Sequence, residues 1–218
     1  LRVEANENMA LVFDLEAHAQ RLLTSIVELG FQLPANFTQE NFAFSLSHQI
    51  KNKLQYFFNK QISFALSEYQ AKKRLCLSDD VYKLRIIYQS AGDFDIEIEK
   101  YKRDLNKTLK VKILGKKEFH IDSSNPIWKH KFLPRPDFSY YLNQGFDEVI
   151  WTDENDNICE GSFTSIIYDD NKSPKANTLP STSLLHFQDL EFVETKKDEL
   201  PEDFYLSNSV MGITNATH

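Results

Sequence analysis

The spacing of apolar residues changes along this chain, and that change limits the folds it can adopt. Between residues 15 and 50 apolar side chains recur every three or four positions, as on one face of a helix. In residues 81–101 they alternate with polar ones or form β-branched runs, the pattern of strands. The order of strand, helices, hairpin, then strands and helices again favours two α+β lobes over a doubly wound sheet.

The first half of the chain contains the clearest helical signals. Asp14 is a candidate N-cap and Gly30 a candidate C-terminal residue, which predicts a helix over 15–29. A second helix is expected after Thr38, and we expect residues 54–75 to be largely helical as well. The apolar face of the second helix would hold Phe42, Leu46 and Ile50.

Residues 81–90 and 93–101 predict a β-hairpin, since Ala-Gly-Asp lies between them. The charged stretch 102–107 lacks apolar periodicity and is the candidate linker between lobes. We therefore expect a small N-terminal α+β lobe over 1–104 and a larger C-terminal lobe over 105–218. The second lobe should contain a strand at 108–114, a helix near 137–144 that ends at Gly145, and two strands joined by an Asp/Asn-rich turn at 153–157.

Charge and cysteine content exclude several classes of protein. The net charge of −7 argues against a general binder of nucleic acid or of a membrane surface. No apolar run approaches the roughly 20 residues needed to span a bilayer. The two cysteines, Cys76 and Cys159, form neither a metal-binding spacing nor a disulfide framework. A cytoplasmic location is expected.

Lys131 is the candidate reactive residue. It lies in the stretch HKFLPR, four residues before Arg135. A lysine in such a stretch is usually a solvated surface residue. However, a desolvated lysine beside other cations loses its proton and becomes a nucleophile toward carbonyl groups. Arg135, Lys129 and His130 could supply that positive field, and the spacing to Arg135 favours Lys131 over Lys129.

Three further motifs are individually weak. Glu160 opens a Glu-Gly-Ser turn, where an acidic residue is common. Arg21 lies in the run His18-Ala19-Gln20-Arg21-Leu22, on a helix where arginines are normally at the surface. Asn208 and Ser209 precede Gly212, in what is usually a simple turn.

Taken in order, His-x-x-Arg-Leu, Lys-x-x-x-Arg, Glu-Gly-Ser and Asn-Ser-x-x-Gly resemble the class IV aminotransferase family, the pyridoxal-phosphate enzymes of fold type IV. Within it the chain looks most like the 4-amino-4-deoxychorismate lyases. The resemblance implies a two-lobe fold like that of D-amino-acid aminotransferases, with pyridoxal 5'-phosphate between the lobes. It also implies a homodimer and a small-molecule substrate, supplied by an aminodeoxychorismate synthase.

The resemblance also implies residue roles. Lys131 would bind the cofactor covalently and then act as general base on the carbon that carries the substrate amine. Glu160 would pair with the pyridine nitrogen and keep the ring protonated. Arg21, Asn208 and Ser209 would bind the phosphate, where guanidinium and hydroxyl donors suit its oxygens. The products would be 4-aminobenzoate and pyruvate, and the reaction would belong to folate biosynthesis.

The chain departs from the family pattern in two places. Ser165 stands five residues after Glu160, where the family usually has asparagine. Between the Glu-Gly-Ser turn and the Asn-Ser strand, relatives carry a glycine- and arginine-containing segment whose amides bind the phosphate. Here residues 169–202 contain neither glycine nor arginine, and Leu184-Leu185 would be the remnant. Either a loop is missing from the sequence or part of the phosphate site has been lost.

Three alternatives to the lyase stay open. The first is a transaminase of D- or branched-chain amino acids that uses the same lysine and glutamate. Transaminases of the family more often carry Gly-Thr where this chain has Asn208-Ser209, which favours the lyase. The second is a degenerate, non-catalytic family member, and the third is a chance match in an unrelated α+β domain. A fold shared by several functions cannot choose among them.

Overall fold

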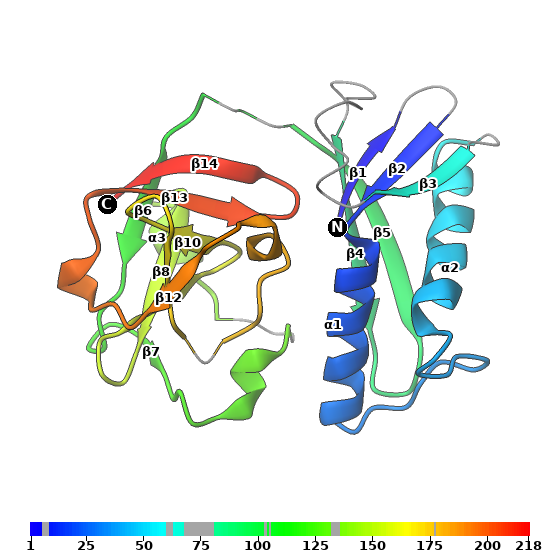
Figure 1. The fold of residues 1–218 in the computed structure, drawn as a ribbon, viewed down its shortest axis with the longest axis horizontal. Helices are drawn as coiled ribbons and strands as arrows, with labels where there is room; N and C mark the ends of the chain where they lie inside the picture. The colour runs from blue at the N-terminus through cyan, green and yellow to red at the C-terminus, as the bar shows by residue number, and fades with distance from the viewer. Residues whose placement is uncertain are drawn as a thin grey trace. The chain divides into compact units, whose positions relative to one another are not determined.

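The computed structural model describes residues 1–5, 9–59, 63–67, 81–102, 104, 106–131, 136–176 and 178–218. The chain divides into two compact units, Leu1–Arg103 and Asp104–His218 (Figure 1). Each unit has its own sheet.

The first unit is built on a five-stranded sheet in the order β3-β2-β1-β4-β5. Neighbouring strands are antiparallel except β2 and β3, which are parallel. The register aligns Val3 with Val12 and Leu84 with Ile98. The strands are β1 (Arg2–Ala5), β2 (Met9–Phe13), β3 (Ser63–Ser67), β4 (Val81–Tyr88) and β5 (Phe94–Tyr101).

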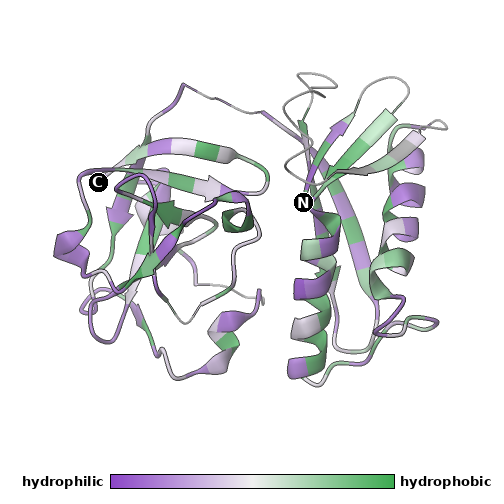
Figure 2. Ribbon diagram, in the orientation of Figure 1, coloured by the Kyte–Doolittle hydropathy of each residue, from purple (hydrophilic) through white to green (hydrophobic). Residues whose placement is uncertain are grey.

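Two helices, α1 (Leu15–Glu28) and α2 (Phe42–Phe57), pack on this sheet. Their inward faces and the facing strand residues form one apolar cluster, so the sheet and helices share a core. Figure 2 shows hydrophobic and hydrophilic residues recurring in turn along both helices, as amphipathic helices require. The helical residues buried in the cluster are Leu15, Ala19, Leu23, Ile26, Phe42, Leu46, Ile50 and Leu54.

The helix and hairpin predictions for this unit are confirmed by α1, α2, β4 and β5. Asp14 does precede α1, but its left-handed backbone (φ 53°) leaves it without a side-chain cap hydrogen bond. The expected helix over 54–75 is wrong at residues 63–67, because they form β3, and residues 60–62 lie outside the described part of the chain. Pairing with β2 outweighs local helix propensity there. Residues 68–75 lie outside the described part of the chain.

The second unit is built on a seven-stranded sheet. Its order is β10-β13-β14-β6-β8-β7, and β9 pairs with β8. Strand β6 runs parallel to both β14 and β8, whereas β8–β9 and β13–β14 are antiparallel. The strands are β6 (Leu109–Ile113), β7 (His120–Ile121), β8 (Glu148–Asp153), β9 (Ile158–Gly161), β10 (Ser165–Ile167), β13 (Asp203–Asn208) and β14 (Gly212–Thr217). A separate parallel pair joins β11 (Lys172–Pro174) to β12 (Glu191–Val193).

Helices of the second unit are short. They are the 3₁₀ turns η2 (Pro126–Lys129), η3 (Leu184–His186) and η4 (Lys197–Glu199), and the single-turn α3 (Ser139–Leu142). The helix expected over 137–144 is therefore only one turn long, and the turn extends to Gly145, which has φ 89°. The strand expected after the 153–157 turn is two strands, β9 and β10, separated by the turn at residues 162–164.

Among the residues that the structure describes, no helix is long and apolar enough to cross a membrane. The same residues include no group of three or more His, Cys, Asp or Glu side chains that could hold a metal ion.

Candidate functional site

Glu160 lies on β9, directly after Cys159, whose side chain is buried on the opposite face of the strand. Cys159 belongs to the hydrophobic cluster of the second unit and is 7% exposed. Because side chains alternate along a strand, Glu160 faces the other side, where it is half-buried. Burial, followed by the charges of Asp153 and Glu160, raises the pKa of the Cys159 thiol. Cys159 therefore stays neutral, and β9 presents the Glu160 carboxyl group on its other face.

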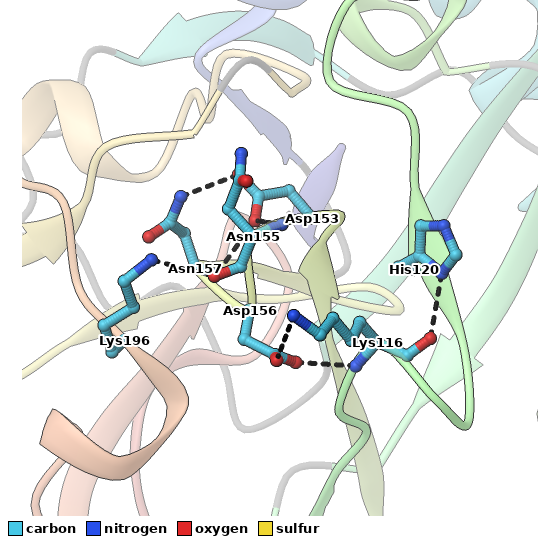
Figure 3. Close-up of polar contacts among 7 residues, drawn as sticks. All are labelled: Lys116, His120, Asp153, Asn155, Asp156, Asn157 and Lys196. Carbon is cyan, nitrogen blue, oxygen red and sulfur yellow. Dashed lines mark hydrogen bonds and ion pairs between the residues drawn. The ribbon is translucent and has the colours of Figure 1, made fainter.

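The turn that joins β8 to β9 is held by side-chain hydrogen bonds (Figure 3). One carboxylate oxygen of Asp153 accepts from the backbone N–H groups of Asn155 and Asn157, each at 2.8 Å. Its other oxygen accepts from the side-chain amide of Asn157, also at 2.8 Å. These bonds satisfy the donors of a tight turn and so fix the far end of the hairpin that carries Glu160.

Neighbouring segments tie this turn to the rest of the unit (Figure 3). The Asp156 carboxylate accepts from the backbone N–H of Lys116 at 2.7 Å, and the Lys116 ammonium lies 3.4 Å from it. The Lys196 ammonium donates to the Asn155 carbonyl at 2.8 Å. A ring nitrogen of His120 lies 2.9 Å from the carbonyl of Lys116. This polar network is satisfied internally, so we assign it a structural role.

Lys131 follows the 3₁₀ turn η2. The Asn125 side chain caps η2 by accepting from the backbone N–H of Ile127 at 3.0 Å, and Pro126 occupies its first position. His130 is buried, whereas Lys131 is exposed, so the desolvation considered for a reactive Lys131 is not seen in this single chain. Arg135, which was expected to contribute to the positive field, lies outside the described residues, as do residues 132–134.

The segments that carry Lys131 and Glu160 are anchored on the same core. Trp128, three residues before Lys131, packs against the hydrophobic cluster of the second unit. Cys159, directly before Glu160, is a buried member of that cluster, together with Val149 of β8. The fold therefore joins two segments that are separated by 29 residues in the sequence, counted from Lys131 to Glu160.

Asn208 and Ser209 lie at a hairpin turn between β13 and β14, where Asn208 pairs with Gly212. The Asn208 side-chain oxygen accepts from the backbone N–H of Val210 at 3.0 Å and of Met211 at 2.7 Å. Gly212 has φ 80°, a conformation that favours glycine. The oxygen of Asn208 is thus engaged within the loop, which leaves the Ser209 hydroxyl as the better candidate for an external ligand.

Sheet pairing brings this loop close to the Glu160 turn. Strand β10, which follows the turn, pairs antiparallel with β13, and Ser165 is opposite Ser207. Ser165 is the residue that stands where the family usually has asparagine. Its place beside the end of β13 puts the two motifs on adjacent strands.

Arg21 belongs to the first unit. It is half-buried on α1, and its guanidinium lies 3.4 Å from a ring nitrogen of His18, one turn earlier. Its predicted role toward a phosphate stays a prediction, as do the roles of Lys131, Glu160, Asn208 and Ser209.

Two features of the second unit escaped the sequence reading. Thr182 and Ser183 are buried just before η3, and the hydroxyls of Ser181 and Ser183 lie 2.9 Å apart. Glu148 is completely buried at the start of β8. The available signal for Glu148 was a charged residue directly before the apolar run Val-Ile-Trp.

No protein-family profile and no curated protein matches the sequence. Solved structures do match. An amino-acid aminotransferase proposed for Mesorhizobium loti has a TM-score of 0.71 and 21% identity, over 100% of this chain and 96% of its own. A hypothetical aminotransferase of Mycobacterium tuberculosis in its PLP-bound form has a TM-score of 0.66 and 14% identity, over 99% of this chain and 78% of its own.

A protein of Legionella pneumophila proposed as a 4-amino-4-deoxychorismate lyase also matches, with a TM-score of 0.62 and 13% identity, over 99% of this chain and 80% of its own. The chain has the type IV aminotransferase fold. The α+β fold-class prediction is therefore confirmed, and these matches include both the aminotransferases and the proposed lyases that the sequence motifs resemble.

Proposed function

We propose that this protein is a pyridoxal-phosphate enzyme that converts 4-amino-4-deoxychorismate to 4-aminobenzoate and pyruvate. The observation that carries the proposal is the arrangement of the second unit. There, the segments bearing Lys131 and Glu160 share one hydrophobic cluster, and the Asn208–Ser209 loop adjoins the strand after Glu160. The type IV fold supports the same reading.

The donor set suits the proposed cofactor. Lys131 is a primary amine that could react with an aldehyde, the half-buried Glu160 carboxyl group suits a protonated ring nitrogen, and the Ser209 hydroxyl is a donor for a phosphate. When bound, pyridoxal 5'-phosphate would withdraw electrons from the carbon that carries the substrate amine. Lys131 would then remove a proton from that carbon, while Glu160 holds the proton on the ring nitrogen.

A transaminase is the second candidate. The match to the Mesorhizobium loti protein, which extends over 96% of that chain, favours it. Such an enzyme would use the same lysine and glutamate, but it would need an amino acid and a keto acid and show ping-pong kinetics.

We also propose that the chain forms a homodimer and receives its substrate from an aminodeoxychorismate synthase. Sedimentation of the purified chain would test the dimer.

The absorption spectrum with added pyridoxal phosphate tests the cofactor and the lysine together. We expect a visible band in the wild type that is absent in Lys131→Ala. Lys129→Ala is the matched control, because it removes an exposed lysine two residues away and should keep the band. Loss of the band in the control alone would reassign the reactive lysine. A colourless wild type at excess cofactor would overturn the proposal and favour a degenerate member of the fold.

Product analysis separates the two enzyme classes. Release of 4-aminobenzoate and pyruvate without a keto acid would support the lyase. Amino transfer that requires a keto acid, without 4-aminobenzoate release, would support the transaminase.

A further inference from the structure

Among the described residues of the second unit, Glu148 is the most completely buried acidic or basic residue, with 0% exposure. One oxygen accepts from the N–H of Val149 at 2.7 Å and from the N–H of Ser162 at 3.0 Å, as well as from the Ser162 hydroxyl. The other accepts from the Thr164 hydroxyl at 2.7 Å and from the N–H of Phe163 at 3.4 Å. Four of these five donors belong to the turn that follows Glu160.

The turn closes directly onto this carboxyl group. The N–H of Gly161 donates to the Thr164 carbonyl at 2.9 Å, and the N–H of Ser162 also donates to the Val149 carbonyl at 2.9 Å. A Cβ at Gly161 would lie 2.2 Å from the Thr164 hydroxyl and 3.0 Å from the Glu148 carboxylate. Only glycine fits at position 161, because a larger residue would collide with Thr164 and Glu148. The backbone directly after Glu160 therefore packs against the Glu148 carboxyl group.

A carboxyl group in this position is costly unless it is fully hydrogen-bonded. Burial raises the pKa of Glu148, while the hydrogen bonds from Ser162 and Thr164 oppose that rise. Three of the donors are backbone N–H groups, which can only donate, and the two carboxyl oxygens of Glu148 are their shared acceptors. An apolar side chain would fill this position without the cost of burying a carboxyl group. We therefore attribute the carboxyl group to its hydrogen bonds with the turn.

We propose that Glu148 is a positioning residue: it fixes the 161–164 turn and thereby sets the direction of the Glu160 carboxylate. The inference rests on the proposed function, in which Glu160 partners the ring nitrogen of the cofactor. Because Glu148 is fully buried and its oxygens accept from the turn, it would act through the turn.

Amide hydrogen exchange in the 218-residue chain, measured without cofactor, tests whether Glu148 fixes the 161–164 turn. Glu148→Gln keeps the size of the side chain but turns an NH₂ group toward donors. We expect the amides of Ser162 and Phe163 to exchange at least about tenfold faster than in the wild type, since the substitution removes an acceptor oxygen from the buried cluster of donors. Val149→Ala is the matched control, because it loosens the core from the adjacent position of β8. Unchanged exchange at Ser162 and Phe163 in Glu148→Gln, or the same selective increase in Val149→Ala, would overturn the proposal.

Thr164→Val covers the case in which Glu148→Gln does not fold. It removes one donor and leaves the carboxylate and the side-chain shape in place. We expect a smaller but selective increase, about threefold or more, in exchange at Phe163. No increase there would count against the anchor.

Titration with pyridoxal phosphate tests the consequence for Glu160. Glu148→Gln should weaken binding by about tenfold and alter the pH dependence of the bound cofactor's absorption in the same direction as Glu160→Gln, whereas Glu202→Gln, the same change at an exposed position of the second unit, keeps the wild-type profile. A wild-type affinity and profile in Glu148→Gln would overturn the positioning role. If the wild type itself binds no cofactor, the proposed function fails, and hydrogen exchange alone decides whether Glu148 fixes the turn.

Discussion

The two units of this protein bury different kinds of side chain. The first unit packs two amphipathic helices on a sheet through an apolar cluster, and its described buried polar residues are Glu4 and Asp14. In the part of the second unit that the structure describes, the helices are short and many more polar groups are buried. Those described are His130, Glu148, Thr152, Asp153, Thr164, Ser173, Thr182, Ser183, Thr195, Ser207 and Thr214.

This difference in buried side chains means that the two units are stabilised in different ways. Apolar packing is non-directional, so it stabilises the first unit without fixing any single polar group. Buried hydrogen bonds are directional and fix the groups that they join. The residues proposed for chemistry, apart from Arg21, lie in the second unit, where turns are held by Glu148, Asp153 and Asn208.

Two spectroscopic probes can follow the units separately. Both tryptophans, Trp128 and Trp151, lie in the second unit, so their fluorescence reports on it. The long helices α1 and α2 lie in the first unit, so helical circular dichroism reports mainly there. Both probes follow unfolding in urea.

The largest effect is expected from Ile50→Ala in α2. Ile50 is 0% exposed in the apolar cluster, so the cavity should cost about 3 kcal/mol of unfolding free energy. The loss should appear in the circular dichroism transition and leave the tryptophan transition in place. Val27→Ala, at an exposed position of α1, should change stability by less than about 0.5 kcal/mol. If both probes move together, the units unfold as one block and the comparison fails.

Thr164→Val should have the next largest effect, in the other unit. It leaves the buried Glu148 carboxylate one donor short, which should cost about 2 kcal/mol. The loss should appear in the tryptophan transition. Thr24→Val on the exposed face of α1 makes the same chemical change without a buried partner. Equal costs for the two variants would contradict the view that directional bonds stabilise the second unit.

Asn208→Ala should cost about 1 kcal/mol, since two backbone N–H groups of the β13–β14 loop lose their acceptor. The tryptophan transition in urea again measures it. Asn215→Ala, at an exposed position of the same hairpin, is the control and should be close to neutral. A cost at position 215 as large as at 208 would show that the loop hydrogen bonds contribute nothing specific.

The smallest effect is expected from Glu154→Gln, and it depends on pH. Hydrogen bonds from the backbone and hydroxyl of Ser123 lower the pKa of Glu154 from 4.5 to about 2. Because the folded pKa is depressed, the stabilisation is present above pH 4.5 and is lost as the pH falls toward 2. The wild type should therefore lose more stability across this window than Glu154→Gln does.

Urea midpoints measured from tryptophan fluorescence across that pH range check this prediction. Glu40→Gln, the same change at an exposed position of the first unit, should leave the wild-type slope intact. Parallel curves for wild type and Glu154→Gln would show that the Ser123 contact is not formed in solution.

Prediction from sequence worked best where one face of an element is apolar. Helix α1 and the β4–β5 hairpin match their predicted positions because their periodicity is set by local burial. It failed at β3, where parallel pairing with the distant β2 decides the conformation. The two-lobe boundaries 1–104 and 105–218 and the site residues stay predictions.

The sequence alone determined the α+β character, the candidate lysine and glutamate, and the resemblance to type IV enzymes. Only the tertiary structure decided that Trp128 and Cys159 share a core and that Ser165 lies opposite Ser207. It also showed that Glu148 is bound by the turn after Glu160. The physical reason is that motifs lie within a few consecutive residues, whereas burial and cross-strand pairing depend on residues far apart in the chain.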